Sequence, residues 1–240
     1  MTAFADQLPA SGVLAVERIP NPRPTGRLLS HAELLYHGLP RAGQTDEVRT
    51  WKTRQANEFL HGLAGVKAAA KLARRHHLMA PYGLLWLQKI TAQGDETDYG
   101  LVSCKIVTTD GVDYIANNFA ATASYSVANF KFHGIGTGVA AAAVGDRALG
   151  TELTTQYQTD NTRPTGTQVK GATGVYSTVG TVTVDASVAA TEWGLFTQAA
   201  TGAQSQPANS MLDRVVYTVV NLASGDSLQA TFTLTFPNGG

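Results

Sequence analysis

Beyond Pro81 the sequence consists of short segments in which apolar and polar side chains alternate between turn residues. In segment 227–236, Leu, Ala and Phe side chains occupy one face of an extended chain, and the other face is mostly threonine. Such alternation is typical of a strand with one side on a core and the other in water. No helical segment long enough for a parallel crossover lies between the segments, so we expect an antiparallel β-sandwich of jelly-roll or Greek-key type. The segments are 84–90, 101–109, 112–119, 125–132, 152–157, 166–169, 175–184, 192–198, 214–221 and 227–236.

The connection between two of these segments carries a specific turn signal. Asp110-Gly111 separates 101–109 from 112–119. Asp-Gly is a preferred pair for the two-residue type I′ turn, whose twist matches that of antiparallel strands. The dipeptide therefore predicts a β-hairpin at this point.

The first residues of the chain follow a different pattern. Residues 1–29 contain four prolines and little periodicity, which predicts an extended arm. Ser30 and Glu33 have the spacing of a capping box, and the apolar residues after them run to Gly38. We therefore expect a short helix after the arm.

A longer helix is expected from Thr45 to a cluster of basic residues, because apolar side chains recur at i, i+3, i+4 and i+7. Trp51 and Phe59 lie on this apolar stripe, and we expect them to pack the helices. Gly62 and Gly65 weaken the prediction, since glycine disfavours a helix interior by about 1 kcal/mol relative to alanine. A kink or break near these glycines is compatible with the pattern.

Together these patterns predict an α+β chain that is mainly β. An N-terminal extended arm and helices precede an antiparallel β-sandwich. We expect a basic arm and helical region at 1–82 and the β-sandwich domain at 83–240.

Charge divides the chain near the same point. Residues 1–90 carry 12 basic and 6 acidic side chains and the rest of the chain carries 6 basic and 12 acidic ones, although the net charge is zero. Such asymmetry predicts that one segment lies on an acidic surface and another faces solvent. The basic residues that we expect to make these contacts are Arg18, Arg23, Arg27, Lys67, Lys71, Arg74 and Arg75.

Lys67, Lys71, Arg74 and Arg75 fall at i, i+4, i+7 and i+8, so they share one face of the long helix. A solvated helix face is one interpretation, and the helix dipole favours cations in a last turn. Nucleic-acid binding is less favoured, because no stacking aromatics interleave with the cations and the isoelectric point is about 7.0. We expect docking on an acidic protein surface, with no nucleic-acid and no membrane partner.

The sequence carries no recognisable catalytic, cofactor or metal motif. The glycines at 134, 136 and 138 do not have the spacing of a dinucleotide-binding turn, and the six histidines are not at metal-ligand spacing. We therefore expect no catalytic residues, no cofactor and no metal. An enzyme such as a glycan hydrolase stays an alternative, because four carboxylates could meet in space and supply an acid and a base. They are Asp185, Glu192, Asp213 and Asp226.

Several stretches of the second part are similar to a known group of proteins. They are 131–138 (KFHGIGTG), 143–149 (AVGDRAL), 151–157 (TELTTQY), 163–168 (RPTGTQ), 182–198, 212–214 and 219–229. These stretches resemble β-rich virion proteins of tailed bacteriophages, and among them the capsid cement (decoration) proteins, with a cyanobacterial phage as a candidate source. The resemblance covers about 83–236.

The resemblance implies a homotrimer at local three-fold positions of a capsid, where it bridges neighbouring capsomers. The expected partner is the major capsid protein, and the expected location is the outer surface of the virion. The resemblance supplies no catalytic residues. The nearest alternative is a tail fibre, baseplate or receptor-binding module that recognises host glycans.

Overall fold

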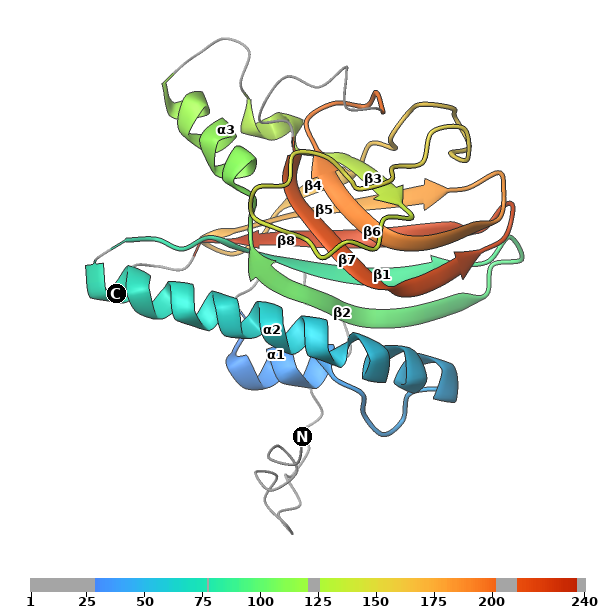
Figure 1. Ribbon diagram of the computed structural model, residues 1–240, viewed down its shortest axis with the longest axis horizontal. Helices are drawn as coiled ribbons and strands as arrows, with labels where there is room; N and C mark the ends of the chain where they lie inside the picture. The colour runs from blue at the N-terminus through green and yellow to red at the C-terminus, as the bar shows by residue number, and fades with distance from the viewer. Residues whose placement is uncertain (1–28, 77, 121–125, 202–210, 237–240) are drawn as a thin grey trace.

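The computed structural model describes residues 29–76, 78–120, 126–201 and 211–236. In this part of the chain two antiparallel sheets pack face to face, and helices α1 and α2 lie on the outer side of the larger sheet (Figure 1). The fold is α+β and mainly β, so the predicted fold class is confirmed. In chain order the elements are α1 (His31–Gly38), α2 (Asp46–His76), β1 (Tyr82–Ile90), β2 (Glu96–Ile106), α3 (Thr109–Phe119), η2 (Val127–Asn129), β3 (Phe132–Gly136), β4 (Thr167–Lys170), β5 (Val175–Thr183), β6 (Val188–Phe196), β7 (Met211–Leu222) and β8 (Ser227–Thr235).

The larger sheet has the strand order β2-β1-β8-β5-β4, and the smaller sheet has the order β3-β6-β7. The chain passes from one sheet to the other after β2, β3, β5 and β7. The main core lies between the sheets and includes Trp193 of β6, Val182 of β5 and Phe232 of β8. Both sheets therefore depend on one shared core, and this body supports the helices.

Strand β8 departs from the prediction on its polar face. Phe232 points into the main core, as the alternation predicts. Thr231, Thr233 and Thr235, however, are at most 2% exposed and do not face water. β8 is the central strand of its sheet, and the Thr233 hydroxyl shares a 2.9 Å hydrogen bond with the Ser177 hydroxyl of β5. Flanking strands on both sides thus help to cover the threonines.

Helix α2 continues through both of its glycines without a break. Gly62 lies against β2, where a Cβ atom would be 2.5 Å from the carbonyl oxygen of Cys104. A Cβ atom at Gly65 would have no neighbour within 4 Å. The first glycine therefore allows close packing of the helix on the sheet, and the second has no such role.

The two aromatic residues expected to pack the helices lie in different clusters. Phe59 belongs to a second core cluster, which the helices form with β1 and β2, and Gly38 of α1 lies against its ring. Trp51 belongs to the main core, and its indole N–H donates a 3.1 Å hydrogen bond to the Val219 carbonyl of β7. Phe59 therefore joins α2 to α1, whereas Trp51 joins α2 to the sheets.

The predicted Asp110-Gly111 hairpin is wrong. β2 pairs with β1 through a turn that includes Gly94, and the segment expected as the second strand forms α3. The Thr108 side chain caps this helix by accepting a 3.0 Å hydrogen bond from the Gly111 backbone N–H. A Cβ atom at Gly111 would lie 2.8 Å from the Leu212 carbonyl oxygen of β7. Asp110 and Gly111 thus occupy the first turn of a helix that packs on a strand.

Two other predicted strands do not form within the described residues. In 125–132 the short helix η2 occupies 127–129, and strand β3 begins only at Phe132. Segment 152–157 meets other strands through isolated bridges instead of a ladder. The predicted arm lies outside the described residues except for its last residue, Leu29.

Candidate functional site

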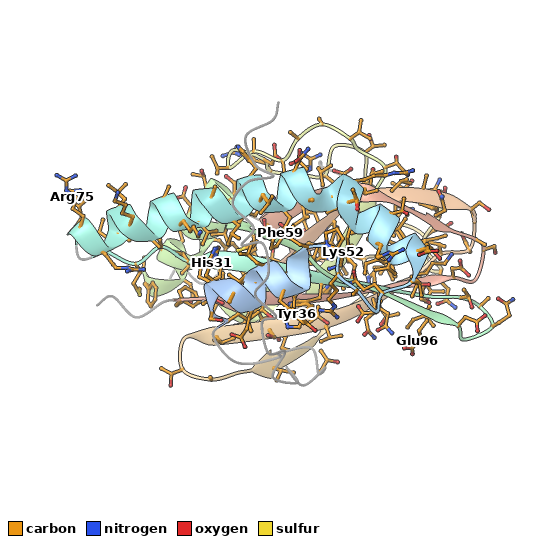
Figure 2. All side chains as sticks on the ribbon, turned by 90° about the horizontal axis from the view of Figure 1, so that it is seen from below. His31, Tyr36, Lys52, Phe59, Arg75 and Glu96 are labelled. Carbon is orange, nitrogen blue, oxygen red and sulfur yellow. The ribbon has the colours of Figure 1, made fainter. Side chains whose placement is uncertain are left out.

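The last third of α2 carries exposed basic side chains. Lys67, Lys71, Arg74 and Arg75 are all exposed. This end of the helix extends beyond the sheets (Figure 1), and Arg75 lies at its tip (Figure 2). The first turn of the helix carries two acidic residues, so the charges at both ends complement the helix dipole.

Three of these four residues line one groove. Lys67, Lys71 and Arg74 contribute to a groove of about 360 Å³ that α1 and α2 form together with the start of β1. None of the described residues that line it is Asp or Glu. The remaining lining residues are His31, Leu34, Leu63, Val66, Ala70 and Tyr82.

Helix α1 is capped at its first end and joined to α2 at its last. Ser30 and Glu33 form the reciprocal hydrogen bonds of a capping box, which confirms that prediction. At the other end the buried Lys52 ammonium of α2 donates to the His37 carbonyl. Burial lowers the pKa of Lys52 to about 8. The capping box thus stabilises the first turn of α1, and the Lys52 contact holds the helix beside α2, where the two helices form the groove.

The floor of the groove is apolar. Leu34 of α1 and Leu63 and Val66 of α2 are buried and belong to the second core cluster with Phe59. Because these side chains also pack against the larger sheet, the floor is part of the folded core.

His31 and Lys67 meet at the groove. The Lys67 ammonium lies 2.8 Å from His31 Nε2. Partial burial, and then the charge of Lys67, lower the pKa of His31. A neutral imidazole accepts the hydrogen bond from the ammonium, so the pair carries one positive charge. The ion pairs within the described residues do not include Lys71 or Arg74. The groove can therefore bind an anionic group.

The structure brings together part of the predicted contact set. Arg18, Arg23 and Arg27 lie outside the described residues. His31 and Tyr82 also line the groove with the cations of α2, although no sequence pattern indicated them. His31 is 36 positions from Lys67, and only the packing of α1 on α2 brings them together. The capping box indicated helix α1, but it did not indicate that His31 would lie beside Lys67.

Glu192, one of the carboxylates considered for hydrolysis, holds a structural position. It is fully buried on β6. Its oxygens accept hydrogen bonds from the backbone N–H groups of Gly138 at 2.9 Å, Gly150 at 2.8 Å and Thr151 at 2.7 Å, and one of them lies 2.7 Å from an Arg214 nitrogen. Glu192 therefore ties the segment after β3 to the smaller sheet.

The same carboxylate explains the glycine run at 134–138. A Cβ atom at Gly136 or Gly138 would lie 2.5 Å from a Glu192 oxygen. A Cβ atom at Gly134 would lie 2.9 Å from a carboxylate oxygen of Glu152. The glycines thus let the backbone approach buried carboxylates, which accounts for them without a phosphate ligand.

The remaining carboxylates have separate surroundings. Asp226 accepts a backbone hydrogen bond in its own turn between β7 and β8, and lies 3.0 Å from the Lys89 ammonium. Asp213 is buried on β7 with Lys105 at 3.5 Å. Asp185 is exposed. Each of the three thus lies in a different local setting from the Glu192 network.

His133 lies in strand β3. It is fully buried, with Trp193 Nε1 donating to its Nδ1 at 3.3 Å and Thr178 Oγ1 at 3.2 Å from its Nε2. Burial lowers the pKa of His133 to about 3. Within the described ranges, no group of three or more His, Cys, Asp or Glu side chains is placed to hold a metal ion. No helix in the described part of the chain has the length and apolar character needed to span a membrane.

No family model, curated protein or solved structure matches the chain. The groove between α1 and α2 is the candidate functional site, because its cations face no carboxylate among the described residues that line it.

Proposed function

We propose that this chain is a structural protein of a tailed-phage virion: a capsid cement protein. In this proposal it binds the outer surface of an assembled shell as a trimer and bridges neighbouring capsomers. Its partner is the major capsid protein, and its role is binding and not catalysis. The resemblance of residues 83–236 to phage virion proteins supports this assignment.

One structural observation carries the proposal. Lys67, Lys71 and Arg74 line a groove in which none of the described lining residues is Asp or Glu. The helix end that carries these cations projects past the sheets (Figure 1). Hydrogen bonds between such cations and carboxylates are stronger than neutral ones. An acidic surface on a shell would supply those carboxylates, whereas the acidic Glu192 of this chain is already paired internally.

The mechanism of stabilisation is mass action. A protein that binds the assembled shell but not its separated subunits stabilises the shell by a free energy that grows with the logarithm of its concentration over Kd. A trimer adds effective concentration, because the second and third contacts form within an already bound molecule. Modest contacts at each groove thus combine into tight attachment.

Co-sedimentation with empty shells assembled from the major capsid protein tests the proposal. The wild-type chain is expected to bind at low salt and to be released as salt rises, because ions screen exposed charges. The double variant Lys71→Glu with Arg74→Glu is expected to bind at least about tenfold more weakly. Arg54→Glu, at an exposed position of the same helix away from the groove, is the matched control.

Binding that is insensitive to salt and to the double variant contradicts the proposal. So does copy number: tens to hundreds of copies per particle fit a cement protein, and a handful of copies fits the tail-tip alternative.

A further inference from the structure

We infer that the groove between α1 and α2 takes an extended acidic peptide segment with a central apolar side chain. The inference rests on the proposed function and names the part of the shell protein that is recognised. It goes beyond attraction between two charged surfaces, because it requires insertion of a side chain between the helices.

The spacing of the cations sets the length of the segment. Lys67 and Arg74 are seven residues apart on α2. At 1.5 Å per residue their backbone positions are separated by roughly 10 Å along the helix. In an extended peptide, side chains two positions apart point to the same face, and four residues cover roughly 13 Å. Carboxylates two positions before and two positions after a central residue therefore share its face, and the long side chains of Lys67 and Arg74 can reach them at the two ends of the groove.

The floor of the groove selects the central residue. Leu34, Leu63 and Val66 present an apolar surface between the cations. Burying an apolar side chain there is favourable by about 25 cal/mol per Å² removed from water. A ligand that carries only charge gains nothing from this floor. The combination of apolar floor and cationic edge thus favours a peptide over a free anion.

The cations are placed to accept such a peptide. The Lys67 ammonium has three donors, and contact with His31 uses one of them and orients the others. The guanidinium of Arg74 can hold a carboxylate through two parallel hydrogen bonds. Within the described residues no carboxylate lines the groove to compete for these donors.

Fluorescence anisotropy with the full chain and labelled synthetic peptides tests the inference. The probe has a central leucine with two glutamates on each side. One control peptide has glutamines in place of the glutamates, and a second has serine in place of the leucine. Both controls are expected to bind at least about tenfold more weakly than the probe, because each lacks one of the two features that the groove matches.

Matched variants locate the binding on the protein. Arg74→Glu reverses a charge that lines the groove, and Arg54→Glu makes the same change at an exposed position of α2 outside the lining. Arg74→Glu is expected to weaken probe binding about tenfold, and Arg54→Glu by less than about twofold. Ala70→Phe fills the groove without a change of charge, and is expected to abolish probe binding. Circular dichroism checks that each variant is folded.

Several results would overturn the inference. They are no binding of the probe, equal effects of Arg74→Glu and Arg54→Glu, probe binding that survives Ala70→Phe, and tighter binding of an oligothymidine of equal charge.

The shell assay separates this inference from the proposed function. If shells bind the wild-type chain and the Ala70→Phe variant equally, the function stands and the groove is not its contact. If the probe binds in the groove but shells do not bind the chain, the groove recognises acidic peptides and the cement function is wrong.

Discussion

Asp213 is a buried carboxylate whose charge is poorly compensated. Its side chain is 1% exposed, and neither of its oxygens has a hydrogen-bond partner within the described residues. Lys105 Nζ lies 3.5 Å from one oxygen. Burial raises the pKa of Asp213 to about 6, and Lys105 offsets only part of this effect. The carboxyl group of Asp213 therefore binds a proton more tightly in the folded protein than in the unfolded chain.

We expect the contribution of Asp213 to stability to fall as pH rises from about 4 to about 6. The unfolded carboxyl ionises near 3.8 and the folded one near 6. A gap of about two pKa units corresponds to about 3 kcal/mol. The Asp213→Asn variant has no carboxyl group to ionise at this position. The unfolding free energy of the variant minus that of wild type should therefore rise by about 2 kcal/mol between pH 4.5 and pH 7.5.

Urea unfolding of both proteins at the two pH values measures this difference. Asp113→Asn, at an exposed position of α3, is the control and should show no such change. If the unfolding free energy of Asp213→Asn relative to wild type instead falls between pH 4.5 and pH 7.5, the charged form of Asp213 stabilises the fold and the expected sign is wrong.

At the scale of elements, the secondary structure of a segment was easier to predict from the sequence than the segment against which it packs. The capping box at Ser30 and the long helix α2 formed because their signals are local. Asp110-Gly111 suits both a tight turn and a first helical turn, and contact of Gly111 with Leu212 favours the helix. The groove needs α1 beside α2, which no local pattern specifies. The cations of the site were therefore predictable, but its floor and His31 were not.

The two glycines of α2 give a paired prediction for this element. Gly65→Ala should raise the unfolding free energy by about 0.5–1 kcal/mol, because alanine favours a helix and the new Cβ meets nothing within 4 Å. Gly62→Ala should lower it by about 1–3 kcal/mol, because the Cβ would lie 2.5 Å from the Cys104 carbonyl oxygen and the helix must shift. Chemical denaturation of both variants measures the two signs. Equal signs would contradict the close packing of α2 on β2.

Over the whole molecule, the acidic side chains of the second part of the sequence and the basic side chains of the first part lie in different surroundings. Much of the acidic character of the second part lies in internal contacts. Arg163, 1% exposed, forms two hydrogen bonds with Glu152 at 2.5 and 2.8 Å, and Arg214 pairs with Glu192 and Asp146. The basic end of α2, in contrast, is exposed. The charge count predicted a difference between the two parts, but the pairing depends on contacts between distant segments and could not be read from it.

A trimer bound to a shell should lose more affinity from a substitution in the groove than a single chain bound to a peptide does. If three chains each place one groove on a shell, their binding free energies combine. Arg74→Glu, expected to weaken a single peptide about tenfold, should then weaken shell binding by up to about a thousandfold. Light scattering should first show a particle of three 25.3 kDa chains, and co-sedimentation at fixed salt gives the shell affinity. Arg54→Glu should cause only small changes in both assays. A monomer in solution, or the same fold-change for peptide and shell, would show that each chain binds independently and that attachment gains nothing from the trimer.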